Sequence, residues 1–138
     1  SGAVAGLVAV TPAAGFVNAT GPLIIGVVAG VLCYVAAAHV KNALGYDDSL
    51  DAFGVHGVGG IIGALLTGVF ADPAINALGQ THSIVTQFYG IIATIVWTAV
   101  ASFVILMITR VLVVGLRPSE QEEEEGLDIT QHGESVTE

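Results

Sequence analysis

The stretch DDSLDAFGVHGVGGIIGALLTGVFA, residues 47–71, decides the fold class of this chain. After Asp51 it is almost entirely apolar, and His56 is its one titratable side chain. Crossing about 30 Å of hydrocarbon takes about 20 helical residues, which is the length of this segment. It therefore predicts a transmembrane helix over residues 51–71 that carries one buried histidine into the bilayer.

Three other apolar stretches predict further spans, over residues 1–17, 22–40 and 83–116. The first is marginal in length, and we expect Pro12 to kink it near its middle because proline removes a helical hydrogen bond. Pro22 suits the first turn of the second span. At 1.5 Å per residue the last span reaches roughly 50 Å, so it must tilt strongly or project from the membrane.

Charge is scarce except at the C-terminal end. Charged residues make up 11% of the chain, against about 25% in soluble domains. Only four of the 12 acidic residues precede Arg117. The sequence thus predicts an all-α fold, a polytopic transmembrane helical bundle over residues 1–117, followed by an acidic tail in water over residues 118–138. Three basic residues are too few for nucleic-acid binding.

Those three basic residues predict the orientation of the chain. Lys41 follows the second span, and Arg110 and Arg117 lie at the end of the fourth. Four spans place both regions on one side of the membrane, and the positive-inside rule makes that side cytoplasmic. We therefore expect a multi-pass protein of the cell membrane (inner or plasma membrane) with a cytoplasmic C-terminus.

His56 is the leading functional candidate. An ionisable group inside a membrane requires a partner or a wet cavity, so it is a functional candidate by default. The glycines around it leave room for another helix or side chain; they are Gly54, Gly57, Gly59 and Gly60. A transport or relay role is favoured, with a structural histidine as the alternative.

Two aspartates precede this histidine. Asp48 or Ser49 can cap the helix, and Asp51 should fall in its first turn, where the helix dipole favours an anion. Capping is the favoured interpretation, and cation binding at the cytoplasmic mouth is the alternative. Structural roles at this helix are expected for Asp48, Asp51, Gly54 and Gly57.

Small residues recur four positions apart, a spacing that lets helix backbones approach closely in lipid. The pairs are Gly2/Gly6, Gly26/Gly30, Gly59/Gly63 and Gly60/Ala64. They predict a tightly packed bundle. Neither a phosphate-binding loop nor a nucleophile with a neighbouring base is apparent, and no histidine pairs with a second ligand at helical spacing. We expect no enzymatic activity, no cofactor and no metal site.

The quoted stretch closely resembles the tenth helix of ammonium transporters of the Amt family. The eighth helix is similar to residues 1–17, SGAVAGLVAVTPAAGFV, and the ninth to residues 22–34, PLIIGVVAGVLCY. The long eleventh helix is similar to residues 93–100, ATIVWTAV, and the cytoplasmic tail motif to residues 122–134, EEEEGLDITQHGE. The DAFGVHGVGG and EGLDITQHGE elements are specific, and the resemblance covers essentially the whole chain.

The resemblance implies a fold of eleven helices whose first ten form two inverted halves, a common transporter design. It also implies a homotrimer in which each subunit has its own pore. This chain would be the C-terminal portion, comprising helices eight to eleven and the tail.

The resemblance also implies ammonium or ammonia transport. In the family two histidines face each other in a narrow hydrophobic pore; by motif His56 is one of them, and the other would lie on a helix outside this chain. Recruited ammonium is deprotonated and ammonia passes the pair. Ser1 matches a small polar residue of the inner vestibule, and Thr11 lies near mid-membrane beside the Pro12 kink, where we expect it to contact the pore. Ala52 faces the cytoplasmic exit, where a larger aliphatic residue is usual.

The tail implies regulation, since in the family it packs on the cytoplasmic face, couples subunits and lies where trimeric PII-type signalling proteins bind. The residues carried over are Arg117, Gly126, Asp128, His132 and Gly133. For the run Glu122–Glu125, a solvated charged segment without a regulatory role is the alternative.

Two other functions remain open. One is a transport-incompetent fragment, or a regulatory module that binds a PII-type protein through its tail. The other is a related Rh-type gas channel, against which the tail motif argues.

Overall fold

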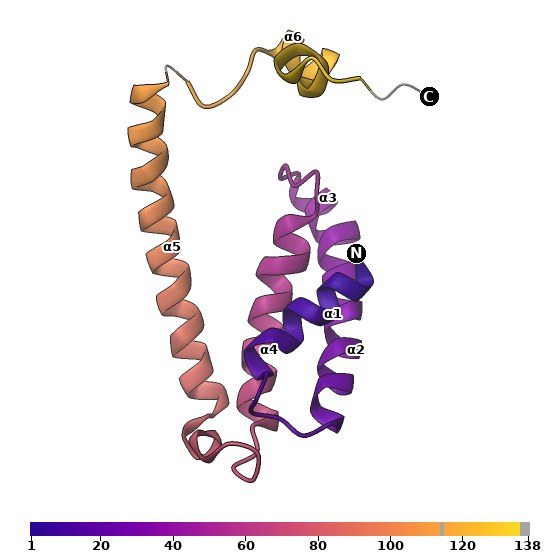
Figure 1. Cartoon of the computed structure of the whole chain (residues 1–138), viewed down its shortest axis with the longest axis vertical. Coiled ribbons are helices and arrows are strands. Elements are labelled where there is room, and N and C mark those ends of the chain that lie inside the picture. The colour runs from indigo at the N-terminus through magenta and orange to yellow at the C-terminus, as the bar shows by residue number, and fades with distance from the viewer. Residues whose placement is uncertain (114, 136–138) are drawn as a thin grey trace. The chain divides into compact units, whose positions relative to one another are not determined.

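The structure is a computed structural model that describes residues 1–113 and 115–135. Within these residues all regular elements are helices, without strands, and one isolated antiparallel bridge joins Val17 to Ala71. The elements are α1 (Gly2–Val10), η1 (Thr11–Ala13), α2 (Thr20–Val35), η2 (Ala36–Val40), α3 (Lys41–Leu44), η3 (Phe53–Gly57), α4 (Val58–Phe70), η4 (Ala77–Thr81), α5 (Ile84–Leu112), α6 (Glu120–Glu125) and η5 (Asp128–His132) (Figure 1). The predicted all-α class is confirmed.

Three helical segments are long and apolar enough to cross a membrane. They are Thr20–Leu44 with 25 residues, Phe53–Phe70 with 18 and Ile84–Leu112 with 29. Each coincides with a span expected from the sequence, although the ends differ by up to four residues. The fourth apolar helix, Gly2–Ala13, is shorter than these.

The first helix ends earlier than predicted. It changes from α1 to the 3₁₀ turn η1, which contains Pro12, and it ends at Ala13 instead of residue 17. Ala14 is extended (φ −59°, ψ 123°) and Gly15 has a φ of +80°, so the chain turns away from the helix axis there. Pro12 therefore lies in the last turn, and the expected kink near the middle of a longer helix was wrong.

The second helix is a continuous rod formed by α2, η2 and α3. Asn18 Oδ1 holds its start by accepting hydrogen bonds from the Thr20 amide at 3.1 Å and the Thr20 hydroxyl at 2.6 Å. Pro22 lies in the first turn, as expected. The rod ends at Gly45, whose φ of +66° is the left-handed conformation typical of a helix C-cap.

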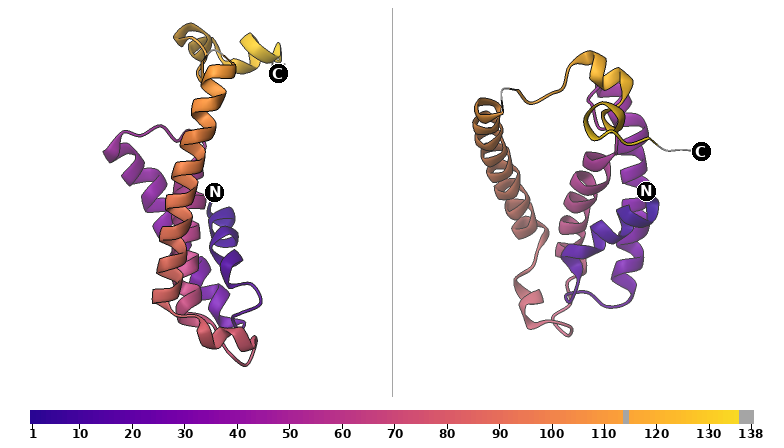
Figure 2. Two further views of the ribbon diagram at one scale, coloured as in Figure 1. Left: turned by 90° about the vertical axis from the view of Figure 1, so that its left-hand side faces the viewer. Right: turned by 45° about the horizontal axis from the view of Figure 1, so that its top comes forward.

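α1, α2 and α4 pack against one another, with α1 lying obliquely across the other two (Figures 1 and 2). The core between them is built mainly from small side chains: Ala5, Ala9, Ala13, Ala29 and Cys33, together with Ile25. A Cβ added to Gly63 would lie 2.1 Å from the carbonyl oxygen of Ala9, and one added to Gly59 would lie 3.3 Å from Cys33 Sγ. Small residues therefore let these backbones approach closely.

This close packing is limited to part of the predicted pairs. A Cβ at four of the other five glycines in these pairs would meet nothing within 4 Å in this chain; they are Gly2, Gly26, Gly30 and Gly60. The Gly59/Gly63 prediction is confirmed. The Gly2/Gly6 and Gly26/Gly30 pairs still meet at one point, because a Cβ on Gly6 would lie 3.8 Å from the Gly26 Cα. At Gly60 no such contact is made by the part of the chain that the structure describes.

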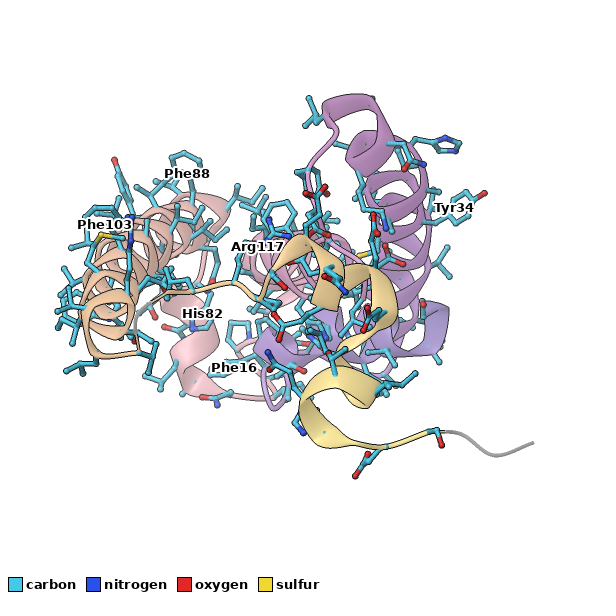
Figure 3. The ribbon with its side chains drawn as sticks, turned by 90° about the horizontal axis from the view of Figure 1, so that it is seen from above. Phe16, Tyr34, His82, Phe88, Phe103 and Arg117 are labelled. Carbon is cyan, nitrogen blue, oxygen red and sulfur yellow. The ribbon has the colours of Figure 1, made fainter. Side chains whose placement is uncertain are left out.

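Phe16 and His82 join the connection after η1 to the segment between α4 and α5. Their rings stack with centroids 4.6 Å apart and planes at 27° (Figure 3). The Phe16 carbonyl also accepts a hydrogen bond from the Asp72 amide at 2.7 Å, next to the Val17–Ala71 bridge. These contacts join the connection after η1 to the segment between α4 and α5.

α5 is a single 29-residue helix, about 44 Å long at 1.5 Å per residue. The chain divides into two compact units within it, Ser1–Ile95 and Val96–Glu138. None of its residues, all of which the structure describes, is buried. Apolar side chains extend from it, such as Phe88 and Phe103 (Figure 3). A helix this apolar and this exposed fits contact with lipid or with other helices.

Candidate functional site

His56 lies in η3, the first turn of the helix that continues as α4. η3 is a π-helical turn, a rare geometry that is frequent at functional sites. The carboxylate of Asp48 caps this turn, because its Oδ2 accepts hydrogen bonds from the amides of Phe53 at 3.0 Å and Gly54 at 3.2 Å. Two amides that have no partner within the helix are thereby satisfied, as the capping prediction required.

Asp51 lies outside the helix, so its predicted place in the first turn was wrong. Its φ is +54°, a left-handed conformation that aspartate tolerates better than most residues. Its carboxylate forms an ion pair with Lys41. Lys41 Nζ also donates a hydrogen bond to the Asp48 carbonyl at 3.1 Å. The cation that Asp51 meets in this structure is therefore the ammonium group of Lys41.

His56 is exposed in this chain, and its predicted burial within a bilayer stays a prediction. Gly54 and Val55 are buried against the second helix. Successive helical residues are separated by about 100° around the axis, which turns the imidazole away from the buried face. The side of the turn that presents His56 is not covered by the described residues.

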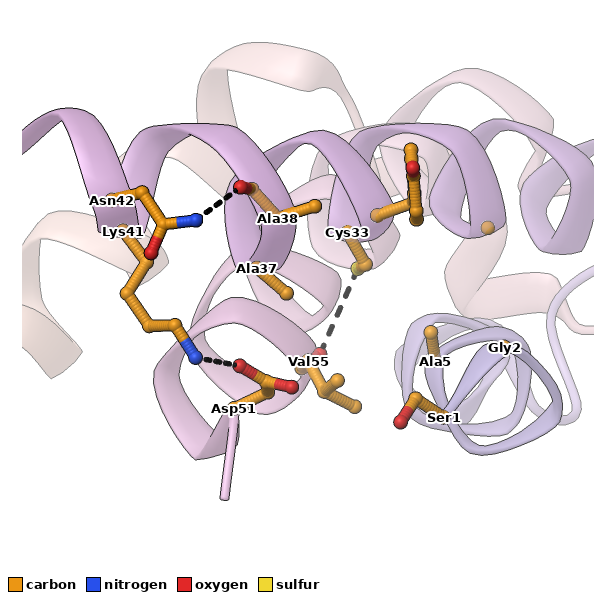
Figure 4. A pocket seen from close by; sticks show the side chains of 12 residues that line it. Ser1, Gly2, Ala5, Cys33, Ala37, Ala38, Lys41, Asn42, Asp51 and Val55 are labelled. Carbon is orange, nitrogen blue, oxygen red and sulfur yellow. Dashed lines mark hydrogen bonds and ion pairs between the residues drawn. The ribbon is translucent and has the colours of Figure 1, made fainter. Parts of the chain in front are cut away.

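A cavity of about 490 Å³ opens between α1, the α2–α3 rod and η3. Ala5 lines it from α1 and Ser1 from just before α1; Cys33 and Lys41 line it from the rod, Val55 from η3 and Asp51 from the segment before η3 (Figure 4). Its polar lining comes from the Lys41–Asp51 ion pair together with Ser1, Tyr34 and Asn42. The structure thus brings Ser1 and Asp51 to one cavity, which does not include His56, Ala52 or Thr11.

Thr11 and Ala52 are both exposed in this chain. The Thr11 hydroxyl donates a hydrogen bond to the Leu7 carbonyl at 2.8 Å, so its proton is used within its own helix. The hydroxyl oxygen can still accept a hydrogen bond. Ala52 directly precedes η3 and presents only a methyl group. The pore-lining roles of Ser1, Thr11 and Ala52 stay predictions.

Gly54 and Gly57 make room for their neighbours. A Cβ on Gly54 would lie 3.2 Å from the backbone and Cβ of Ala37 on the second helix. A Cβ on Gly57 would lie 2.8 Å from the Phe53 ring. Gly54 therefore permits the close approach of η3 to the rod, whereas Gly57 leaves space for the phenylalanine ring. Both contacts fit the structural roles expected for these residues.

Sequence reasoning missed the residues of the second helix that contact η3 and the segment before it. They are Cys33, Ala37 and Lys41, which contact Val55, Gly54 and Asp51 in that order. Their four-residue spacing, which places them on one helix face, was visible in the sequence. An apolar cysteine and alanine in an alanine-rich segment give no signal beyond ordinary packing.

The tail begins with a short helix, α6, held by a capping box. The Ser119 hydroxyl accepts a hydrogen bond from the Glu122 amide, and the Glu122 carboxylate accepts from the Ser119 amide at 2.8 Å and hydroxyl at 2.7 Å. The bond from the Ser119 backbone, followed by that from its hydroxyl, lowers the pKa of Glu122. Arg117 donates to both carboxylate oxygens of Glu123 at 3.0 Å. The acidic run is therefore an ordered helix.

The other tail residues predicted to be functional surround η5. Gly126 and Gly133 have positive φ values of 93° and 67°, and Gly133 caps η5. Asp128 and His132 are exposed, and the Asp128 carbonyl accepts a hydrogen bond from the Glu134 amide at 2.8 Å. The two glycines thus have a backbone reason to be glycine. The regulatory roles of these residues, and of Arg117, stay predictions.

Three comparisons identify related proteins. The "Ammonium Transporter" of Aquifex aeolicus is 53% identical over 99% of this chain and 33% of its own length. The "Ammonium transporter" of Bacillus subtilis is 45% identical over 99% of this chain and 35% of its own. The crystal structure of Saccharomyces cerevisiae Mep2 superposes with a TM-score of 0.71 at 38% identity, covering 86% of this chain and 29% of that one. The Candida albicans Mep2 structure gives a TM-score of 0.72 at 33% identity.

The chain thus spans about a third of the length of the curated relatives that it matches. These relatives are transporters by name and not enzymes. Together with the apolar helices, they make the chain part of a multi-pass membrane protein. The sequence model described as the Ammonium Transporter Family matches residues 1–137, so the chain belongs to that family.

Proposed function

We propose that the complete protein transports ammonium or ammonia across a membrane through a pore lined by His56. One observation carries the proposal: in a chain of this family, the helical turn is capped and packed on one side while it presents His56 on its uncovered side. An exposed imidazole at the start of a membrane-spanning helix needs a partner from outside these residues, or a wet cavity.

The chemistry of the pore follows from the cost of desolvation. Moving an ammonium ion through a dry passage carries a charge penalty far larger than moving neutral ammonia. Deprotonation of ammonium before the constriction avoids that penalty. A neutral imidazole both donates and accepts hydrogen bonds, so it can bind ammonia as it passes and can relay the separated proton. A second histidine, from outside this chain, would complete the pair.

The remaining pore residues have supporting roles in this proposal. Ser1 supplies a hydroxyl at the inner vestibule, next to the cavity that Asp51 also lines. Ala52 leaves the cytoplasmic exit wider than a larger aliphatic residue would. Thr11 offers a hydroxyl oxygen beside the pore.

We further propose a homotrimer in the cell membrane with the tail in the cytoplasm. The basic residues Lys41, Arg110 and Arg117 support this orientation through the positive-inside rule. The ordered tail, with its acidic helix α6 and the capped turn η5, is a suitable contact surface for a PII-type signalling protein.

The alternatives are a transport-incompetent fragment or a PII-binding regulatory module, for which the folded tail is the favouring observation. An Rh-type gas channel is a further alternative, and the EGLDITQHGE tail argues against it.

The test replaces His56 in the complete protein, reconstituted in liposomes. We expect His56→Ala to abolish ammonium-dependent flux or to reshape its selectivity against potassium, because the imidazole that binds ammonia is lost. His39→Ala is the matched control, since His39 lies in η2 of the second helix and its ring contacts that of Tyr34. Unchanged flux and cation selectivity in His56→Ala would remove His56 from the mechanism.

A further inference from the structure

One face of the second helix contacts the segment before and within η3 at three successive heights. Cys33, Ala37 and Lys41 are spaced four residues apart along α2, η2 and α3, so they lie one above another on that face. We call these three residues the stripe. In the opposite chain direction it meets Val55, Gly54 and Asp51, as in two antiparallel elements (Figure 4).

Each contact of the stripe has a different chemistry. Cys33 Sγ donates a weak hydrogen bond to the Val55 carbonyl at 3.8 Å. Ala37 packs closely against Gly54: a Cβ added to Gly54 would lie 3.2 Å from the Ala37 backbone. Lys41 forms the ion pair with Asp51. The stripe therefore fixes both the height and the rotation of this segment.

Lys41 holds both aspartates that start the helix. It pairs with the Asp51 carboxylate and donates to the Asp48 carbonyl at 3.1 Å. The Asp48 carboxylate in turn accepts the amides of Phe53 and Gly54. The side chains of Lys41 and Asp51 are only 22% and 31% exposed, so water competes with this ion pair less than on an open surface.

The two elements in contact are both π-helical. η2 (Ala36–Val40) faces η3 (Phe53–Gly57), and each is a single wide turn within an otherwise α-helical segment. Such turns shift the register of the side chains that follow, so the direction of His56 depends on how η3 is held. His56 is exposed, whereas its neighbours Gly54 and Val55 are buried in contact with the stripe, so we infer that the imidazole is directed away from it.

We propose that Lys41, with Ala37 and Cys33, is a positioning residue that fixes the orientation of His56 from the opposite side of the helix. The inference rests on the proposed pore function of His56. In this role Lys41 acts through Asp51 and Asp48, with which it is in contact.

The test measures backbone exchange and transport in the complete protein. Lys41→Met keeps the aliphatic stem and removes the charge, whereas Lys41→Arg keeps the charge. Asp51→Asn removes the ion pair from the other side and retains a residue that tolerates a positive φ. Val40→Ala is the control, since Val40 is adjacent to Lys41 and 41% exposed.

We expect amide exchange of residues 53–57 to be roughly tenfold faster or more in Lys41→Met and Asp51→Asn, because charged hydrogen bonds that hold the turn are lost. Selectivity for ammonium over potassium should fall in the same two variants at equal protein amount. Lys41→Arg should retain the exchange rate and the selectivity of the wild type, and so should Val40→Ala.

Unchanged exchange in both variants would overturn the inference, as would faster exchange with wild-type flux and selectivity. If Lys41→Met does not assemble, the amide exchange and selectivity of Asp51→Asn provide the same test. A wild-type protein without ammonium transport would instead reject the proposed function, and the exchange data would still decide whether the stripe holds the turn.

Discussion

Gly63 is a residue at which the identity of the side chain is dictated by a neighbouring backbone. A Cβ at this position would lie 2.1 Å from the Ala9 carbonyl oxygen and 2.8 Å from its Cα. These are backbone atoms, so they cannot rotate away as a flexible side chain would. Relief requires α1 and α4 to separate, which would loosen the small-residue core around Ala9, Ala13 and Ala29.

Gly63→Ala should therefore destabilise the complete protein by about 1–3 kcal/mol or more, the usual range for overpacking. Gly60→Ala is the matched control, because a Cβ there meets nothing within 4 Å in this chain. Alanine in a helix is favoured over glycine by about 0.5–1 kcal/mol, so this control should be neutral or slightly stabilising. Thermal unfolding in detergent measures the stability of both variants. A melting temperature of Gly63→Ala equal to that of Gly60→Ala would contradict the predicted contact.

For single residues, the sequence predicted the role that a side-chain type suggests better than it predicted backbone conformation and pairing partners. Asp48 caps the helix as its residue type suggests, whereas Asp51 adopts a positive φ and pairs with a lysine ten positions earlier in the chain. Helical periodicity cannot anticipate such a pairing because it depends on how two helices meet. His56 was predicted from the cost of placing an imidazole in a membrane, but its exposure depends on residues outside the chain.

Among the elements, α6 is stabilised by protonation-sensitive hydrogen bonds. The Glu122 carboxylate accepts two bonds from Ser119, and these bonds lower the pKa of Glu122 from its ordinary value of 4.5. A carboxyl group whose pKa is lower in the folded state stabilises the fold above its unfolded pKa. That contribution is lost as the pH falls through the folded value.

The N-terminal turn of α6 should therefore stay ordered at neutral pH and fray as the pH falls below about 4.5. Nuclear magnetic resonance of the Ser119 amide, titrated in the complete protein, measures this transition. Glu122→Gln should remove the transition, since the amide does not titrate in this range. Ser119→Ala should raise the pKa of Glu122 partway, because the backbone donor remains. A Ser119 signal that titrates identically in Glu122→Gln would contradict the assignment.

The sequence predicted some elements better than others for physical reasons. The long apolar stretches of α2 and α5 are evident from hydropathy alone. The end of the first helix at Ala13 depends on a backbone reversal at Gly15, which an apolar run conceals. The capping-box spacing from Ser119 to Glu122 was present in the sequence, but a run of glutamates also fits an unfolded charged segment.

For the molecule as a whole, the exposed apolar surface exceeds what the described chain can cover. None of the residues of α5 is buried, and large apolar side chains on α1, α2 and α4 are also exposed. Lipid can cover part of this surface. His56 is different, because we expect its imidazole to lie at membrane depth, where it requires a polar partner or water and not lipid. The pore that we propose is therefore formed between this chain and the remainder of the protein.

This argument predicts that the chain alone does not transport. Reconstituted in liposomes, residues 1–138 should give no ammonium-dependent current or pH change above that of empty vesicles, because one wall of the pore is absent. The complete protein, at the same protein-to-lipid ratio, is the control and should give both signals. Mixing the chain with a separately produced remainder of the protein should restore transport if the two parts assemble. Robust transport by the chain alone would show that His56 needs no partner from outside these residues.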